Sequence, residues 1–240
     1  SDMLFGKRTI ADAVSKPGVG FHKFGNMTIG AKLALTFMGL LVLVAVFAPL
    51  ISPQDPLAIT LSYQPPSSDH LFGTDQVGRD VMSRVFYGAR YSLVIGLLSI
   101  LFALILGVII GAVAAVSRTW ISEIIMRVLD VFMSVPGIAL AAVFVSILGQ
   151  SMIGIIISIG ILYVPQIARI LRANIISEYG KDYVRAVIVS GARAPWILYK
   201  HVTRNIAAPV MVFTTLCVAD AIVFEASLSF INLGIPEPTP

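Results

Sequence analysis

The sequence contains few charged residues and only one cysteine. Of its 240 residues, 12% are Asp, Glu, Lys or Arg and 57% are hydrophobic, whereas soluble domains carry roughly 25% charged residues. This composition excludes an ordinary soluble domain and indicates a polytopic membrane protein. Because Cys217 has no second cysteine to pair with, an internal disulfide and a cysteine-based zinc site are excluded. We expect Cys217 to be a small apolar filler.

Motifs of common enzymes are also missing. The two Gly-Lys pairs, at residues 6–7 and 180–181, are followed by Arg and Asp, so the sequence has no phosphate-binding loop. It has no His-Glu metal motif and no Gly-x-Ser-x-Gly elbow. The net charge of +4 is divided between the tail and the loops, which argues against nucleic acid as a partner. We therefore expect a chain that is not itself an enzyme and binds no metal or other cofactor.

Long apolar runs predict an all-α fold, a polytopic transmembrane helix bundle. A spanning helix needs about 20 apolar residues, and a helix satisfies its own backbone hydrogen bonds in lipid. The predicted spans cover residues 31–51, 91–116, 121–148, 152–172 and 206–230. A polar tail, residues 1–30, precedes them, and residues 91–240 form the core domain.

Residues 52–90 are too rich in proline and polar residues to span a membrane. From Arg79 onward, apolar residues recur at helical spacing, so a short surface helix is expected to lead into the second span. The run from Gly73 to Asp80 is typical of a turn followed by a helix start, with Thr74 or Asp75 as a possible N-cap.

The second predicted span carries small residues at intervals of four, namely Ala103, Gly107, Gly111 and Ala115. Small residues on one stripe allow another helix to approach closely, which favours helix association in lipid. We expect this face to pack against protein.

The third predicted span begins with charged residues and contains a proline. Glu123, Arg127 and Asp130 share one helical face and are expected to pair at the mouth of the span. A proton relay is the alternative. Pro136 and the glycine after it predict a kink or a local unwinding, which is either a packing feature or irregular backbone lining a water-filled path.

The fifth predicted span contains two carboxylates, Asp220 and Glu225. A carboxylate near the centre of a span costs about 2.5 to 3.5 kcal/mol, so both are expected to face the bundle interior or a cavity. Five residues apart on a helix, they point in different directions and do not form a paired acid-base site. We expect Glu225 to be structural or gating and leave the role of Asp220 open.

A patterned polar stretch, residues 178–205, interrupts the apolar runs. Its first part predicts an amphipathic helix over residues 178–190. Gly191 permits a sharp change of direction, and Pro195 suits the first turn of a second helix. That helix carries Trp196 in an exposed apolar cluster over residues 196–199, a feature that indicates a protein partner.

This stretch resembles the cytoplasmic loop of ABC importer permeases, in which a Glu-Ala-Ala triplet, three residues and a glycine follow one another. The triplet positions hold Arg185, Ala186 and Val187, and the glycine is Gly191. The chain is similar to the dipeptide, oligopeptide and nickel branch, where Arg for Glu is common. Val187 departs from the pattern, as does Arg204 where the family often has proline.

The resemblance implies a type I ABC importer permease (MetI-like) fold whose coupling helix sits in a groove of a separate ATP-hydrolysing subunit. The implied coupling residues are Arg185, Ala186, Val187, Gly191, Ala192, Pro195, Trp196, Ile197 and Tyr199. The alternative is a helix lying in the headgroup layer, with Trp196 and Tyr199 as interfacial anchors.

The resemblance also implies partners and a location. The partners are a second homologous permease, two ATP-binding subunits that hold ATP and magnesium, and an extracytoplasmic solute-binding protein. Residues 73–80 are a candidate contact for the solute-binding protein. The location is a bacterial or archaeal plasma or inner membrane.

The pathway or gating candidates are Asp130, Pro136, Asp220 and Glu225, and a sixth span is expected beyond residue 240. The solutes of this branch are peptides or nickel, and peptides are the first expectation here.

Basic residues predict the orientation. With the tail in the cytoplasm, 14 Lys and Arg residues lie inside and 3 lie outside, as the positive-inside rule requires.

Two other classes of protein compete with the permease. An ion-coupled carrier or channel would use Asp220 and Glu225, and an intramembrane hydrolase would have only Ser146, Ser158 and Asp220, without a motif.

Overall fold

The computed structural model describes residues 28–236, and every regular element among them is helical apart from one bridge between Thr74 and Asp80. The chain divides into two compact units, residues 1–43 and 44–240, and helix α2 (Ile29–Ile51) runs across that boundary. The helix begins two residues before the predicted first span. The predicted tail, residues 1–30, lies almost entirely outside the described residues.

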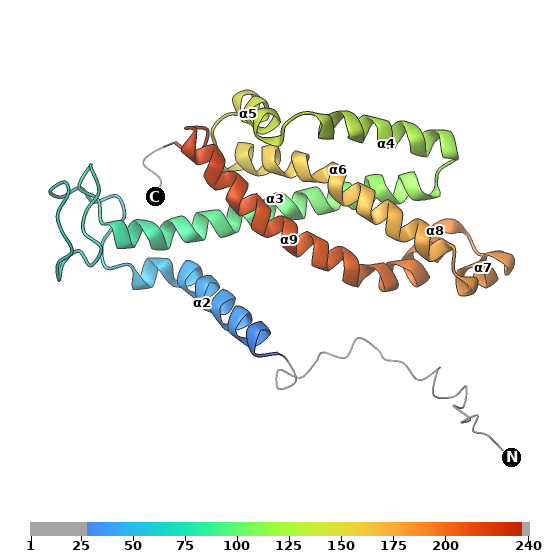
Figure 1. Cartoon of the computed structure of the whole chain (residues 1–240), viewed down its shortest axis with the longest axis horizontal. Coiled ribbons are helices and arrows are strands. Elements are labelled where there is room, and N and C mark those ends of the chain that lie inside the picture. Colours follow the sequence, from blue (N-terminus) through green and yellow to red (C-terminus); the bar gives the residue numbers. More distant parts are fainter. Residues whose placement is uncertain (1–27, 237–240) are drawn as a thin grey trace, which may run out of the picture. The chain divides into compact units, whose positions relative to one another are not determined.

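Three long helices form the centre of the second unit. They are α3 (Val81–Val116), α6 (Met152–Tyr179) and α9 (Thr203–Phe230), which lie side by side in Figure 1. The expected surface helix and second span form one continuous helix, α3. Helix α6 continues seven residues beyond the predicted end of its span at residue 172, because its last two turns pack against the loop that follows.

The most extensive contact in the bundle joins α3 to α6, and it uses the small residues of α3. Ala103, Gly107 and Gly111 are buried, whereas Ala115 is half-buried. A Cβ atom on Gly107 would lie 2.7 Å from Ile167 Cγ2, and one on Gly111 would lie 2.6 Å from the backbone oxygen of Ala168. The two backbones approach closely only because side chains are absent there.

The third predicted span is two helices, α4 (Thr119–Ser134) and α5 (Gly137–Leu148). They meet at a bend of 93°, with Pro136 at the start of α5. Proline lacks an N–H group and restricts the preceding residue to extended backbone, so the chain breaks here. Helix α5 packs on α6, as Figure 1 shows.

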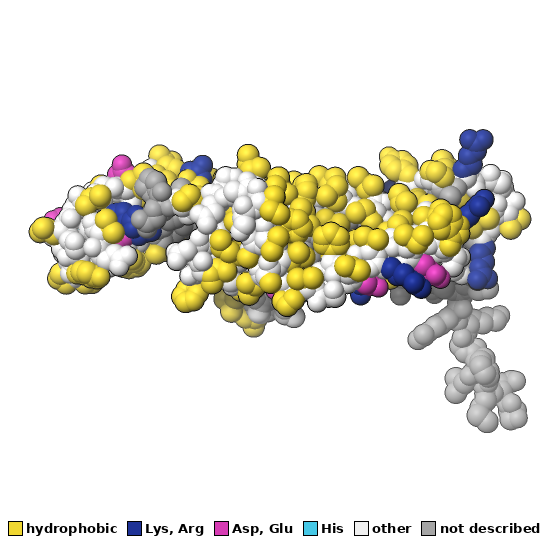
Figure 2. All heavy atoms as spheres, turned by 90° about the horizontal axis from the view of Figure 1, so that it is seen from above, with side chains coloured by type: hydrophobic (Ala, Val, Ile, Leu, Met, Phe, Trp, Pro, Cys, Tyr) yellow, Lys and Arg dark blue, Asp and Glu magenta, His cyan; other side chains and the backbone are white. Residues whose placement is uncertain are grey.

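Four helices of the described residues are long and apolar enough to cross a membrane, and the bent pair α4 and α5 brings the number to five if it counts as one span. Figure 2 shows hydrophobic side chains over the middle of one face, with Lys, Arg, Asp and Glu gathered toward its two ends. The outer stripe of α3 consists of exposed apolar residues, Leu97, Leu101, Ile105 and Ile109. This distribution is that of a multi-pass membrane protein.

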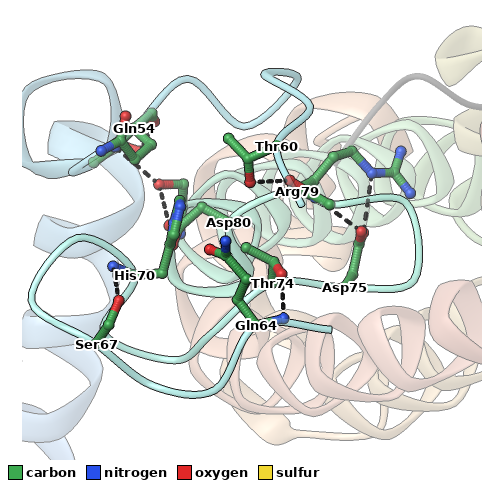
Figure 3. A network of polar contacts seen from close by, with 12 residues as sticks. Gln54, Thr60, Gln64, Ser67, His70, Thr74, Asp75, Arg79 and Asp80 are labelled. Atoms are coloured by element: carbon green, nitrogen blue, oxygen red, sulfur yellow. Dashed lines mark hydrogen bonds and ion pairs between the residues drawn. The ribbon is translucent and has the colours of Figure 1, made fainter. Parts of the chain in front are cut away.

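The α2–α3 segment, residues 52–80, is held together by hydrogen bonds rather than by helices or strands (Figure 3). Gly73 and Gly78 have φ values of +73° and +89°, and a Cβ atom on either would lie within 2.4 Å of a backbone oxygen. Thr74 Oγ1 donates to the Leu61 oxygen at 2.7 Å and accepts from the Gln64 N–H at 2.8 Å. These residues therefore have structural roles.

The predicted N-cap of the helix after this segment is wrong. Thr74 and Asp75 are both engaged within the segment, and Asp80 caps α3 by accepting a hydrogen bond from the backbone N–H of Ser83 at 2.8 Å. Asp75 instead accepts from the Val77 and Arg79 backbones and forms ion pairs with Arg79 and Arg84.

Candidate functional site

The polar stretch between α6 and α9 folds as an elbow. Helix α7 (Asp182–Val189) is followed by Gly191 with a φ of +84° and then by α8 (Ala194–Ile197). A left-handed backbone is strained for any residue with a side chain, so glycine determines the change of direction. The π-helical turn η2 (Leu198–Val202) then leads directly into α9.

A small apolar core fixes the elbow to the bundle. Val184, Ile197 and Val202 are fully or almost fully buried, and they pack with Leu171 and Ile175 of α6. The prediction that Ile197 belongs to an exposed cluster is therefore wrong. Ile197 acts as the internal anchor of α8, because α8 has only one turn and must bury one side to stay in place.

The opposite side of the elbow is open. Trp196 is 45% exposed and Tyr199 is 84% exposed. The ammonium group of Lys200 lies 4.9 Å from the centre of the Trp196 ring, and the His201 ring centre lies 5.0 Å from that of Trp196. These contacts hold a large aromatic side chain at the surface.

A shallow hollow of about 570 Å³ lies beside Trp196, and its lining comes from both arms of the elbow: Val187, Ser190, Gly191, Ala192, Arg193, Trp196 and His201. Arg185, Ala186, Pro195 and Tyr199 are exposed but do not line the hollow. Of the nine implied coupling residues, four line this hollow and four others are exposed, whereas Ile197 is buried. We call the hollow and the exposed coupling residues of the elbow the elbow surface.

Sequence reasoning missed the residue that joins the elbow to two helices. Glu178 is buried at the end of α6, so the predicted amphipathic helix starts four residues too early. Its carboxylate accepts hydrogen bonds from the Tyr183 hydroxyl and from Asn205 Nδ2 at 2.7 Å, and Lys181 Nζ lies 2.6 Å away. The spacing to Lys181 and Tyr183 was visible in the sequence, but the contact with Asn205 was not.

The bend between α4 and α5 creates a second candidate region. A cavity of about 150 Å³ lies at the bend, and Tyr163 and Gln166 of α6 and Phe224 of α9 contribute to its lining. Residues 131–139, which include Pro136, are all exposed. The bend thus presents irregular backbone and apolar side chains on the surface of this chain.

The charged residues of α4 do not pair as predicted. Asp130 forms an ion pair with Arg169 of α6, and within residues 28–236 no ion pair joins Arg127 to Glu123 or Asp130. Arg172 Nε donates to Ser122 Oγ at 2.8 Å. These contacts hold α4 against α6, and the Asp130 pair, being exposed, contributes little to stability.

The two carboxylates of α9 lie in different environments. Glu225 is 9% exposed and accepts hydrogen bonds from Ser92 Oγ at 3.2 Å and Ser229 Oγ at 3.0 Å. Asp220 is exposed, so of its two expected environments it does not occupy the interior of this chain's bundle, and its position at a cavity stays a prediction. The candidates Asp130, Pro136, Asp220 and Glu225 do not converge on one site within this chain.

Comparison with known proteins gives consistent matches. A family model described as binding-protein-dependent transport system inner membrane component matches residues 103–239. The chain is 38% identical over 219 residues to the di/tripeptide transport system permease protein of Pseudomonas aeruginosa, which covers 88% of this chain and 72% of that protein. It is 35% identical over 234 residues to the oligopeptide transport system permease protein of Bacillus subtilis, covering 95% and 77%. It is 42% identical over 237 residues to a probable peptide ABC transporter permease of Sinorhizobium fredii, covering 97% and 81%.

Proposed function

Because the chain belongs to the family of binding-protein-dependent transport system inner membrane components, we propose that it is a permease subunit of an ATP-driven importer of dipeptides or oligopeptides. The observation that supports this most directly is the similarity to three peptide permeases over most of the chain. In this role the chain forms part of the solute pathway, and the chemistry of ATP hydrolysis belongs to other subunits.

The proposed assembly contains a second homologous permease, two ATP-binding subunits and an extracytoplasmic solute-binding protein. ATP and magnesium would bind in the ATP-binding subunits, and this chain would bind neither a metal nor another cofactor. We place the complex in a bacterial or archaeal plasma membrane with the amino terminus in the cytoplasm, because that orientation leaves 14 of the 17 Lys and Arg residues inside.

The elbow surface is our candidate for the contact with the ATP-binding subunit. It presents an exposed Trp beside a hollow, and aromatic residues in such positions often dominate binding energy. Its buried side is fixed to α6 through Ile197, and η2 continues into α9, so a displacement of the elbow would move two spanning helices together. Rigid-body rotation of this kind would switch access from outside to inside.

The exposed bend between α4 and α5 and the exposed face of α9 are our candidates for the pathway, shared with the second permease. A carboxylate such as Asp220 is costly against lipid, and irregular backbone at membrane depth requires protein or water around it. A neighbouring permease that encloses water would meet both needs.

The test is ATP-driven peptide uptake by the assembled complex in proteoliposomes. We expect Trp196→Ala to reduce uptake at least tenfold while the permease stays folded and inserted in the membrane, because Trp196 is 45% exposed and contributes little to the core. Trp120→Ala is the matched control, since Trp120 is the other Trp and is 59% exposed; it should retain more than half of the uptake. Unchanged uptake in Trp196→Ala would refute the coupling assignment.

The same proteoliposomes separate the importer from an ion-coupled carrier. An importer requires ATP and is indifferent to the dissipation of ion gradients, whereas a carrier that uses Asp220 and Glu225 would be driven by such a gradient without ATP.

A further inference from the structure

A polar cavity lies where α3 begins and α9 ends. Its volume is about 480 Å³, and its lining includes Arg84, Tyr91, Ser92, Gln150, Glu225 and Ser229. Pockets that hold small ligands are usually about 300 to 1,000 Å³ in volume. The cavity is thus large enough for a small molecule, and it is distinct from the elbow surface.

Glu225 is the acidic residue in the cavity lining. Glu225 as a whole residue is only 9% exposed, and its carboxylate accepts hydrogen bonds from the hydroxyl groups of Ser92 and Ser229. No Lys, Arg or His among the described residues forms an ion pair with it. Buried carboxylates are ordinarily paired with a cation, and a carboxylate has about four acceptor positions, so two remain for a positively charged ligand.

The same cavity also presents a cation. Arg84 uses Nη1 to bind Asp75, and a guanidinium group has five N–H donors, so donors remain for a second acceptor. A metal ion is a poor match for this site, because no cluster of three or more His, Cys, Asp or Glu exists in the part of the chain that the structure describes. The lining fits an organic molecule with a positive and a negative end.

We propose that this cavity binds the charged ends of a short peptide, with Glu225 accepting hydrogen bonds from the α-ammonium group and Arg84 donating to the carboxylate. The assignment rests on the proposed function, in which the solutes are peptides and the start of α3 faces the cell exterior. The cavity is then an entry site that a peptide occupies after leaving the binding protein.

Direct binding to the assembled complex without its binding protein tests the assignment, with dialanine and N-acetyl-dialanine as probes. In the wild type, dialanine should bind at least tenfold more tightly, because acetylation removes the ammonium group. Glu225→Gln keeps the size of the side chain and one acceptor oxygen, and its NH2 group can donate to the oxygen of the second serine hydroxyl. Because it removes the charge, it should weaken dialanine binding at least tenfold and abolish the preference. Glu123→Gln, an exposed carboxylate on α4, is the control and should behave as wild type.

Access to the cavity gives a second measurement. A Glu225→Cys variant in a Cys217→Ala background should react with a membrane-impermeant thiol reagent added outside. Lack of reaction would show that protein fills the cavity and would overturn the assignment. Equal affinity of the wild type for both peptides, or an unchanged preference in Glu225→Gln, would also overturn it.

Failure of this site and failure of the proposed function give different results. Wild-type proteoliposomes that take up no peptide with ATP would refute the importer itself. The entry site alone is refuted if the complex takes up peptide with ATP and the Glu225→Gln variant still prefers dialanine over its acetylated form as strongly as the wild type does.

Discussion

Asp80 Oδ1 lies 3.1 Å from His70 Nδ1, and the other oxygen of the same carboxylate accepts hydrogen bonds from the Ser83 backbone and hydroxyl. One buried side chain thus caps α3 and holds the α2–α3 segment against it (Figure 3). The Ser83 hydroxyl also accepts from the Gln54 N–H at 3.2 Å, which extends the network to the start of the segment.

The first prediction concerns this contact. Asp80→Ala should destabilise the α2–α3 segment by about 2 kcal/mol, because it removes an N-cap and leaves buried donors without an acceptor. Hydrogen exchange in the assembled complex should show faster exchange in the first turns of α3. Asp69→Ala, at an exposed position of the same segment, should leave exchange unchanged; equal effects of the two variants would contradict the prediction.

The second prediction concerns pH. Burial opposes ionisation of Asp75, but hydrogen bonds from the Arg79 and Val77 backbones and from the Arg79 and Arg84 side chains outweigh it and hold the pKa of Asp75 well below its ordinary 3.8. A depressed folded-state pKa contributes stability above the unfolded-state value, and this contribution is lost as the pH falls toward the folded-state value.

The stability difference between the wild type and Asp75→Asn should therefore be constant from pH 7 to pH 5 and shrink below about pH 4. Hydrogen exchange within residues 60–80 measures it, with the variant at each pH as the reference for effects of other groups. A difference that stays the same at pH 3 would show that the ionised carboxylate is not what stabilises the segment.

The third prediction concerns the contact between α3 and α6. Gly111→Ala should destabilise the bundle by about 1 to 3 kcal/mol, because the new Cβ would lie 2.6 Å from a backbone oxygen that cannot move independently of α6. Thermal unfolding of the purified complex measures it. Gly39→Ala in α2, where no atom lies within 4 Å of the new Cβ, is the matched control, and similar losses in both variants would refute the packing argument.

The sequence predicted features whose causes are local. Apolar runs predicted the long helices, the spacing of Gly107 and Gly111 predicted a packing face, and Gly191 predicted a change of direction. Each depends on residues near one another in the chain, so helical periodicity and backbone conformation were sufficient.

Features that depend on distant partners could not be predicted. Thr74, Asp75 and Asp80 are all acceptable N-caps by type, and only contacts with residues such as Leu61 and Arg84 leave Asp80 for that role. Glu178 joins α6 to Asn205, 27 residues later. Asp220 was expected to face the bundle interior or a cavity because a charged group is costly in a membrane span, but the sequence does not reveal that Asp220 is exposed in the single chain.

The fourth prediction concerns Gly191. A β-branched residue is poorly compatible with a φ of +84°, so Gly191→Val should distort the elbow and reduce ATP-driven uptake at least tenfold. Asn tolerates this backbone region better, so Gly191→Asn should retain more uptake. Gly180→Ala, at a φ of −71°, controls for loss of a glycine as such. The order Asn above Val is the discriminating result, because a residue needed only for its small size would give equal losses.

The fifth prediction concerns Asp220, which is exposed and lies along α9 between Leu216 and Val223, both more than 60% exposed. Placing its carboxylate against lipid would cost about 2.5 to 3.5 kcal/mol, so in the assembled importer this position should border water. In a Cys217→Ala background, Asp220→Cys should react with a charged thiol reagent at least tenfold faster than Leu101→Cys. Leu101 is a suitable reference, because it is 48% exposed on the apolar outer stripe of α3. Equally slow reaction of the two cysteines would place residue 220 against lipid or in a dry interface and remove it from the pathway.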